Sequence, residues 1–442
     1  MEKQKIKSVK GITLIALVVT IVVLLILAGV SVNALFGNSG IIEKAKEAQN
    51  AMDKAKENDE KGINELTNWI DNQVNGTTGR NDNPTANDLP SVAGETMPYY
   101  PDATFKKVAG TNLDAGLVIQ DESGNEYVWI EVPKSLYANS SYNTETTTAD
   151  QKPASSTDYD KIEYCLHKYT DYYRNGTKYT DTYYSDAVTG LTSTQYAELK
   201  QKMLKSVYEN GGFWIGRYEA GITTKRTASG TPTVASLSKQ GTVENPVYPY
   251  NDVTCKQAQT VTNMLTTNDY TSSLMFGVQW DLVMKHIEVK AVEQGTALAT
   301  IQRALRSGSE DWGNYYNASF VINRGKYAKY GALTTWYNYN IALANYVTYA
   351  NGISKKVSAS SYSNGILLTT GASDACKKMN IYDLAGNVSE WTLEYTANTS
   401  CPCVPRGGSF FNDGSNSSAF YRSNGGTAVS TDSIGFRPSL YK

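Results

Sequence analysis

The chain of 442 residues carries 41 Lys and Arg against 43 Asp and Glu, for a formal net charge of −2 at pH 7. This balance argues against a nucleic-acid-binding protein, which needs a basic surface to neutralise phosphates. The two His residues cannot build a three-His metal site, and five Cys leave at least one thiol without an intrachain partner. Charged residues make up only 19% of the chain, and 32 Tyr dominate the aromatic residues. Such a surface is typical of proteins that bind by stacking and hydrogen bonding.

The amino-terminal segment predicts a membrane anchor. Residues 1–11 are a basic leader with Lys at four positions, and residues 12–34 follow as an almost uninterrupted apolar run. At about 1.5 Å per residue this run is long enough to cross the hydrocarbon core of a bilayer. The basic leader should stay in the cytoplasm. The sequence therefore predicts a single-pass protein of the cell membrane, with its C-terminal domain outside the cell.

The same segment, KGITLIALVVTIVVLLILAGVSV, resembles the type IV prepilin signal, in which a short basic leader ends in Gly before an apolar helix. The resemblance implies cleavage by a prepilin peptidase after Gly11, N-methylation of Ile12, and contacts with other pilin-like subunits in a cell-surface pilus. The family usually has Glu at the fifth mature position, where this chain has Ala16. That difference argues against polymerisation, and a plain membrane anchor is the alternative interpretation.

Three further regions follow the anchor. In residues 41–75, apolar residues recur at spacings of three and four among balanced charges, which predicts a stalk helix. Residues 76–97 are rich in turn formers and are interpreted as a flexible linker. Residues 98–442 are predicted to form one large extracellular domain of the α+β class.

Within this domain, the pattern at residues 117–132 predicts a β-hairpin, whereas residues 135–190 show no clear period and are interpreted as surface loop. An apolar strand is expected in 213–221, and short strands with long turns are expected beyond residue 300. Apolar residues at helical spacing predict helices at 196–207, where Gly211 would end the helix, and at 254–267 and 279–289.

Three motifs occur in order near the carboxyl end: NIYDLAGNVSEWT at 380–392, RGGSF at 406–410 and IGFRP at 434–438. Together they resemble the formylglycine-generating, sulfatase-modifying factor family, which implies a C-type-lectin-like fold over residues 98–442. Active members of that family bind copper through two Cys five positions apart, between the second and third motifs. This chain has no Cys between Phe410 and Ile434, and Ser418 and Ser423 fall near the expected places.

A hydroxyl is not a soft copper ligand, so formylglycine generation is not expected. A related branch binds iron through three His, which two His cannot supply. Neither copper nor iron is therefore expected as a cofactor. The resemblance does imply a structural calcium ion, with ligands from Asp383, Gly386, Val388 and Glu390. The alternative is that the two carboxylates only cap turns.

Segment 410–433 lies where related folds display a ligand-binding surface. The sequence offers seven candidate contact residues there, which are Phe411, Asn412, Asn416, Phe420, Tyr421, Arg422 and Asn424. The overall prediction is a membrane-anchored or pilin-like protein that displays a catalytically degenerate domain for binding an extracellular protein or glycan. The alternatives are an enzyme with altered chemistry on the same fold and a structural filament subunit.

The remaining reactive side chains are interpreted as structural. His167 and His286 are expected at the surface or at its boundary rather than as general bases. Cys401 and Cys403 are too close in sequence to form an unstrained disulfide with each other. In an oxidising exterior, one of them would pair with a more distant thiol, the options being Cys165, Cys255 and Cys376.

Overall fold

The computed structural model describes Ile21 and residues 88–139, 158–174, 179–228, 230–341, 346–349, 352–355 and 361–442. The chain divides into two compact units, Met1–Gly76 and Thr77–Lys442. The predicted leader, membrane helix, stalk and first part of the linker lie outside the described residues, apart from Ile21. Among the described residues, no helix combines the length and apolar character that a membrane crossing requires.

The centre of the second unit is a six-stranded antiparallel sheet with the strand order β1-β2-β3-β5-β20-β8. Its strands are β1 (Lys106–Lys107), β2 (Val118–Gln120), β3 (Glu126–Glu131), β5 (Gly212–Gly216), β20 (Pro438–Tyr441) and β8 (Thr271–Leu274). Strands β2 and β3 confirm the predicted hairpin. Strand β20 pairs with both β5 and β8, so the last residues of the chain lie inside the sheet rather than at its edge.

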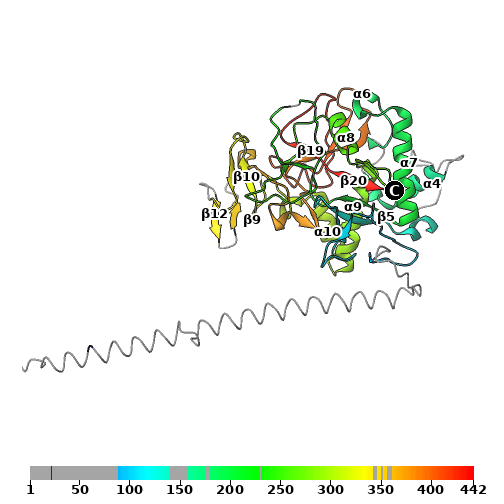
Figure 1. Ribbon diagram of the computed structural model, residues 1–442, viewed down its shortest axis with the longest axis horizontal. Coiled ribbons are helices and arrows are strands. Elements are labelled where there is room, and N and C mark those ends of the chain that lie inside the picture. Colours follow the sequence, from blue (N-terminus) through cyan, green and yellow to red (C-terminus); the bar gives the residue numbers. More distant parts are fainter. Residues whose placement is uncertain are drawn as a thin grey trace, which may run out of the picture. The chain divides into compact units, whose positions relative to one another are not determined.

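Helices pack against this sheet and against one another (Figure 1). They are α4 (Asp158–Tyr169), α5 (Asp171–Arg174), α6 (Asp186–Thr189), α7 (Ser193–Asn210), α8 (Cys255–Asn263), α9 (Gly277–Glu293) and α10 (Leu298–Arg306). Short 3₁₀ turns are η1 (Lys134–Ala138), η2 (Ser309–Asp311), η3 (Tyr362–Asn364) and η4 (Asp374–Cys376). All three predicted helices are confirmed as α7, α8 and α9. Helix α7 starts with a capping box at Thr192 and ends at Gly211, whose φ of 66° suits glycine.

The prediction of surface loop for residues 135–190 is wrong for much of that stretch. It contains η1, α4, α5, α6 and the short strand β4 (Tyr179–Thr180). On α4, Ile162, Cys165 and Leu166 are buried at helical spacing, and this helix contacts α7. Charged and Tyr residues between them hide the apolar stripe from a sequence pattern, because Tyr can lie on either side of a helix. Residues 140–157 and 175–178 lie outside the described residues.

The carboxyl-terminal half adds smaller sheets of mixed direction. Strand β17 pairs antiparallel with β18 and β4 and parallel with β19, and every residue of β17 is buried. The strands are β6 (Gly221–Ile222), β7 (Tyr248–Pro249), β9 (Phe320–Ile322), β10 (Lys326–Lys329), β11 (Trp336–Asn338), β12 (Tyr346–Tyr349), β13 (Gly352–Lys355), β14 (Ile366–Leu368), β15 (Lys377–Lys378), β16 (Ile381–Tyr382), β17 (Ser389–Thr396), β18 (Cys403–Arg406) and β19 (Ile434–Phe436). In Figure 1 the yellow strands β9, β10 and β12 lie on the side away from α4 and α7. The mixed content confirms the α+β class.

Candidate functional site

The arginine of the third motif lies in the protein interior. Arg437 is 0% exposed, and its Nη2 donates to Glu390 Oε1 at 2.7 Å while its Nε lies 3.1 Å from Oε2. Its remaining donors bind the carbonyl oxygens of Gly216 and Tyr382 at 2.8 Å each. A buried guanidinium is tolerated only when its donors are satisfied in this way. Arg437 therefore connects β17, β5 and β16, which explains the motif as scaffold.

The Glu390–Arg437 pair bears directly on the expected calcium site. Both carboxylate oxygens of Glu390 accept from Arg437, so a cation already lies next to this group. The Oδ2 atom of Asp383 accepts from the Gly371 N–H at 2.8 Å, and burial raises the pKa of this carboxyl to about 7. Its Oδ1 atom has no hydrogen-bond partner among the described residues. In this arrangement the residues do not fit a calcium ion that Glu390 and Asp383 share.

Hydrogen bonds and close backbone packing account for the shape of the 383–390 loop. The side chain of Asn387 accepts from the Leu368 N–H and from Asn314 Nδ2, each at 2.9 Å, and donates to Glu219. Gly386 has a φ of +78°, and a Cβ there would lie 2.1 Å from the Asn314 carbonyl oxygen. Val388 is buried in a small apolar cluster with Leu367 and Phe410. Its side chain and Gly386 thus have packing roles.

A second buried charge network, here called the Arg406 network, consists of Arg406, Arg422, Asp281 and Glu394. Arg422 lies 2.7 Å from Asp281 and 2.9 Å from Glu394, and Arg406 lies 2.9 Å and 3.0 Å from the same two acids. Burial alone would raise the pKa of Glu394, but the charges of Arg422 and Arg406 lower it. The side chain of Arg422 is 2% exposed. The prediction that Arg422 contacts ligand is therefore corrected: it joins β17, β18 and α9 in the interior.

The two serines near the expected catalytic positions make hydrogen bonds to backbone carbonyl oxygens. Ser418 is 1% exposed, and its hydroxyl donates to the Arg306 carbonyl oxygen at 2.8 Å. The backbone N–H of Ser423 donates to the Pro405 carbonyl oxygen at 3.0 Å. Neither side chain offers the thiolate that copper chemistry of the family needs. The described arrangement gives these positions a structural role.

Of the six remaining candidate contact residues, Phe411 and Phe420 lie in different surroundings. Phe411 packs beside Tyr330 with ring centroids 6.2 Å apart, and Tyr330 lies 5.3 Å from Tyr362. Phe420 instead lies against the Arg306 guanidinium, 4.5 Å from its ring centroid. Four of the six, Phe411, Asn412, Phe420 and Tyr421, are half-buried, and two, Asn416 and Asn424, are exposed. Phe411 thus lies directly beside the exposed ring of Tyr330, whereas Phe420 and the exposed ring of Tyr172 both contact the Arg306 guanidinium.

These rings extend into a larger surface, here called the aromatic face, made of Tyr248, Tyr330, Trp336, Tyr362 and Phe411. Tyr330 is 40% and Tyr362 is 58% exposed, whereas most large rings of the second unit, here called the head, are buried. Trp336 and Phe411 pack on the same apolar cluster, and Tyr248 meets Trp336 edge to face at 4.8 Å. The sequence analysis missed all but Phe411. The available signal was the run of aromatic residues among polar ones in 327–339.

A pocket of ≈ 410 Å³ lies at the Trp336 end of the aromatic face. Its walls carry the rings of Tyr248 and Trp336 and four Thr side chains, at positions 223, 224, 227 and 334. Rings beside hydroxyl groups suit ligands that have both apolar and hydrogen-bonding surfaces. Lys225 also lines the pocket, but its ammonium binds Asn251 at 2.8 Å and Asp252 at 3.2 Å.

His286 is more deeply placed than expected, whereas His167 lies at the expected boundary. His286 is 3% exposed, so the prediction of a surface or boundary position is wrong. Its Nδ1 accepts from the Glu131 N–H at 3.3 Å, and burial, with the nearby Lys290 charge, lowers its pKa to about 3. His167 is half-buried and lies 3.4 Å from Glu163. Both His residues therefore have partners within the fold.

His167, Glu163 and Asp181 form a cluster whose ligand atoms lie within 4.8 Å of one another. Protein groups already bind the two acids. Lys200 lies 2.8 Å from Glu163, and the carboxylate of Asp181 accepts from the first N–H groups of α9, at 2.6 Å from Gly277 and 2.9 Å from Val278. Helix capping and ion pairing explain the cluster.

Among the three expected partners for Cys401 or Cys403, the structure brings one close. The buried Cys255 and Cys403 side chains interact, and this contact, together with burial, raises the pKa of the Cys255 thiol well above its usual value. All five Cys are reduced thiols in the structure. Cys255 is thus the thiol that the structure places in contact with Cys403.

Comparison with known protein families supports the resemblance that the carboxyl-terminal motifs indicate. Residues 297–439 match the family model described as the sulfatase-modifying factor enzyme 1-like domain. No curated protein matches the chain in sequence. Among solved structures, Treponema denticola variable protein 1 is similar at 14% identity and a TM-score of 0.29, over 52% of this chain and 85% of that one. A structure titled "Crystal Structure of CarF" gives 14% identity and a TM-score of 0.28, over 52% of this chain and 86% of that one. Both TM-scores are low. The family match confirms a sulfatase-modifying-factor-like domain at residues 297–439.

Proposed function

We propose that this protein binds an extracellular protein or glycan through the aromatic face, and that residues 12–34 hold it in the cell membrane as a single-pass or pilin-like anchor. The observation that carries the proposal is the exposure of neighbouring rings, with Tyr330 at 40% and Tyr362 at 58%. Exposed Tyr side chains offer large contact areas at a small cost in conformational entropy, and so they are common in binding surfaces.

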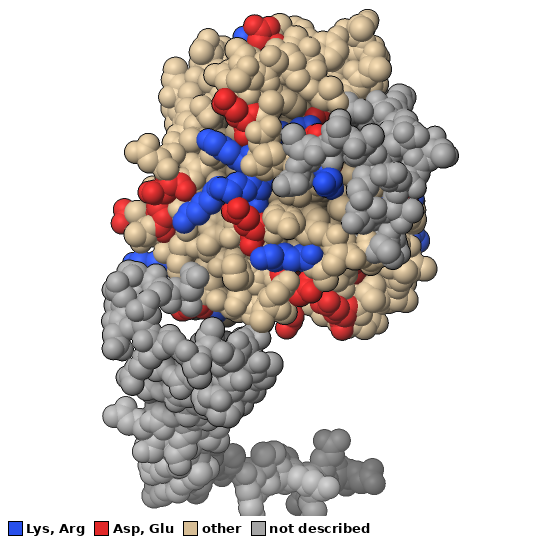
Figure 2. Space-filling view, turned by 90° about the vertical axis from the view of Figure 1, so that its right-hand side faces the viewer, with Lys and Arg blue, Asp and Glu red and all other residues tan. Residues whose placement is uncertain are grey.

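The charge balance of the chain also favours recognition without a strong electrostatic field. Figure 2 shows the side opposite the yellow strands of Figure 1, where basic and acidic side chains are interspersed among uncharged residues. With a formal net charge of −2, the chain has no strong field that would select nucleic acid. Stacking and hydrogen bonding remain as the means of recognition, which suits glycans and polar protein surfaces.

The residues at the family's catalytic positions support binding over catalysis. Ser418 and Ser423 stand where thiols are expected, and the Ser418 hydroxyl is committed to the Arg306 carbonyl oxygen at 2.8 Å. An enzyme with altered chemistry remains the rival function. It predicts that copper or iron co-purifies with the full chain and that oxygen is consumed with a thiol peptide.

The test is binding of the full chain, held in lipid nanodiscs, to arrays of glycans and cell-surface proteins. Tyr330→Ala and Phe411→Ala should weaken any retained ligand at least tenfold. Tyr208→Ala is the matched control, because Tyr208 is also an exposed Tyr, at 47%, but lies on α7 outside the aromatic face. Retention of no ligand would contradict the binding function. Equal loss in the control, or none in the two variants, would contradict the location.

A further inference from the structure

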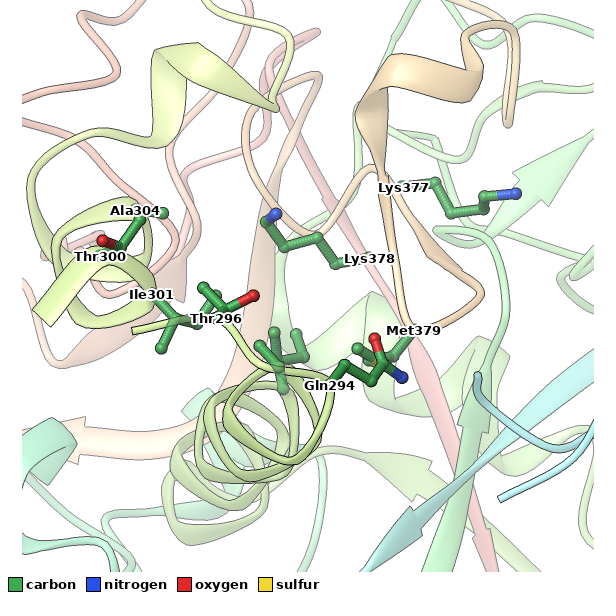
Figure 3. A pocket seen from close by; sticks show the side chains of 10 residues that line it. Gln294, Thr296, Thr300, Ile301, Ala304, Lys377, Lys378 and Met379 are labelled. Carbon is green, nitrogen blue, oxygen red and sulfur yellow. The ribbon is translucent and has the colours of Figure 1, made fainter. Parts of the chain in front are cut away.

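A second pocket, of ≈ 290 Å³, lies between α9, α10 and the β15–β16 hairpin, away from the aromatic face (Figure 3). Apolar side chains form much of its wall, among them Ile287 from α9, Ile301 from α10 and Met379 from the hairpin turn. Its volume is close to the lower limit of about 300 Å³ for small-molecule sites. The pocket therefore suits a small ligand with an apolar part.

One cation points into this apolar space. Figure 3 shows the side chain of Lys378 reaching across the pocket towards α10, whereas neighbouring Lys377 points away from it. Among the described residues the Lys378 ammonium has no hydrogen-bond or ion-pair partner, and it lies 5.2 Å from the Trp312 ring centroid. Asp311, the acid whose charge acts on Lys378, is bound to Arg303 at 2.6 Å. Burial lowers the pKa of Lys378, as expected for a cation that lacks a counter-charge.

The first turn of α10 adds polar groups to the same wall. Thr296 and Thr300 line the pocket, and Figure 3 shows the Thr296 hydroxyl on the side of Lys378. Ala297 is the N-cap residue of α10 and supplies no side-chain cap, and the first turn contains no acidic residue. The positive end of this helix is thus uncompensated by a side chain. It reinforces the positive potential that Lys378 sets up.

We propose that this pocket binds a small organic carboxylate with an apolar body. The carboxylate would pair with the Lys378 ammonium, and the body would lie against Ile301 and Met379. Of the two Lys that line the pocket, only Lys378 points into it, which matches one negative charge, and no guanidinium lines the pocket to bind the several oxygens of a phosphate. The site is separate from the aromatic face, so it stands or falls independently of the proposed function.

The experiment measures binding of benzoate and hexanoate to the full chain in nanodiscs by ligand-observed NMR, with inorganic phosphate and benzyl alcohol as comparison probes. One of the two carboxylates should bind in the millimolar range or tighter, and both comparison probes should bind at least tenfold more weakly. Lys378→Met should weaken the carboxylate at least tenfold. Lys377→Met is the matched control and should leave its affinity unchanged.

Thr300→Trp provides a second variant that keeps Lys378 and fills the pocket from an exposed position on α10. It should also abolish binding, and it tests the site if Lys378→Met does not fold. Failure of both carboxylates to bind wild-type protein at millimolar concentration would overturn the proposal. Undiminished binding in Thr300→Trp, or equal binding of benzyl alcohol, would overturn it as well.

Discussion

The Arg406 network and the aromatic face draw on the same stretch of chain but follow opposite rules. Arg406 and Arg422 are buried, and each contacts the two acids of the network. Phe411 lies between them in sequence, yet it is half-buried at the surface beside the exposed ring of Tyr330. Arg406 from the second motif and Arg422 from the segment after it thus hold the scaffold, while Phe411 from the same stretch is presented at the surface. A resemblance carried by motifs therefore says more about fold than about function in this protein.

The largest effect is expected from breaking the Arg406 network. Arg422→Met leaves Asp281 and Glu394 with one guanidinium between them, which should lower the free energy of unfolding by about 3–5 kcal/mol. Urea denaturation followed by tryptophan fluorescence measures this change. Arg303→Met is the matched control, because the Arg303–Asp311 pair is exposed, at 57% and 56%, and should contribute below about 1 kcal/mol. Equal losses of stability in the two variants would contradict the distinction between the buried Arg406 network and the exposed ion pair.

A smaller effect is expected from crowding the 383–390 loop. In Gly386→Ala the new Cβ would overlap the Asn314 carbonyl oxygen, so the loop must shift at a cost of about 1–3 kcal/mol beyond backbone strain. Gly94→Ala is an unusually close control. Gly94 has the same φ of +78° but no atom within 4 Å of the added Cβ, so it reports the strain alone, about 1 kcal/mol. Thermal unfolding of both variants should separate the cost of the contact from the cost of backbone strain. Equal shifts in the unfolding temperature would show that the contact with Asn314 has no role.

A pH-dependent effect is expected from buried His286. Its pKa is lowered to about 3 from the ordinary value of 6.5, so the unfolded chain binds more protons between these values. Stability should therefore fall as pH decreases from 6.5 towards 3, with a limiting slope of about 1.4 kcal/mol per pH unit. Asp181, whose pKa burial raises to about 6, acts with the opposite sign between pH 3.8 and 6. The difference between wild type and His286→Gln isolates the histidine, and identical slopes would show that it does not titrate in this way.

The smallest effect is expected from calcium. Because Arg437 already lies against both oxygens of Glu390, millimolar calcium should leave the unfolding temperature of the full chain unchanged. Differential scanning calorimetry with calcium and with a chelator makes the comparison. A calcium-dependent rise that Glu390→Gln removes would show that the ion displaces the guanidinium, and would restore the ligand set that the family resemblance implies.

Local signals in the sequence were enough for much of the fold. The α7 helix was predicted because apolar spacing and Gly211 mark its body and its end. Helix α4 was missed because its buried stripe is short and surrounded by Tyr and charged residues, which occur equally in loops. Arg422 was misplaced for a different reason. Its partner Asp281 is 141 positions away, so no local pattern reveals that the charge is buried.

The aromatic face likewise depends on contacts that no local sequence pattern reveals. Phe411 was predicted from the composition of its segment, but Tyr330, Trp336 and Tyr362 join it only through folding of the β10–β11–β14 sheet and its neighbours. The Lys378 pocket has no sequence signature, since helices α9 and α10 and a hairpin some 70 positions later build it together. The aromatic face, with two exposed and three half-buried rings, differs from the many buried rings in accessibility and not in residue type.

The position of β20 has a consequence for how the head is assembled. Strands β5 and β8 both pair with β20, and Ser439 faces Ile215 on one side and Ser273 on the other. A chain that emerges amino terminus first therefore leaves facing edges of the main sheet without their shared neighbour until residues 438–441 follow. Non-local pairing of this kind slows folding and exposes strand edges to aggregation. The head should depend on chaperones while it is synthesised or exported, and removal of residues 438–441 should prevent formation of the native sheet rather than trim its edge.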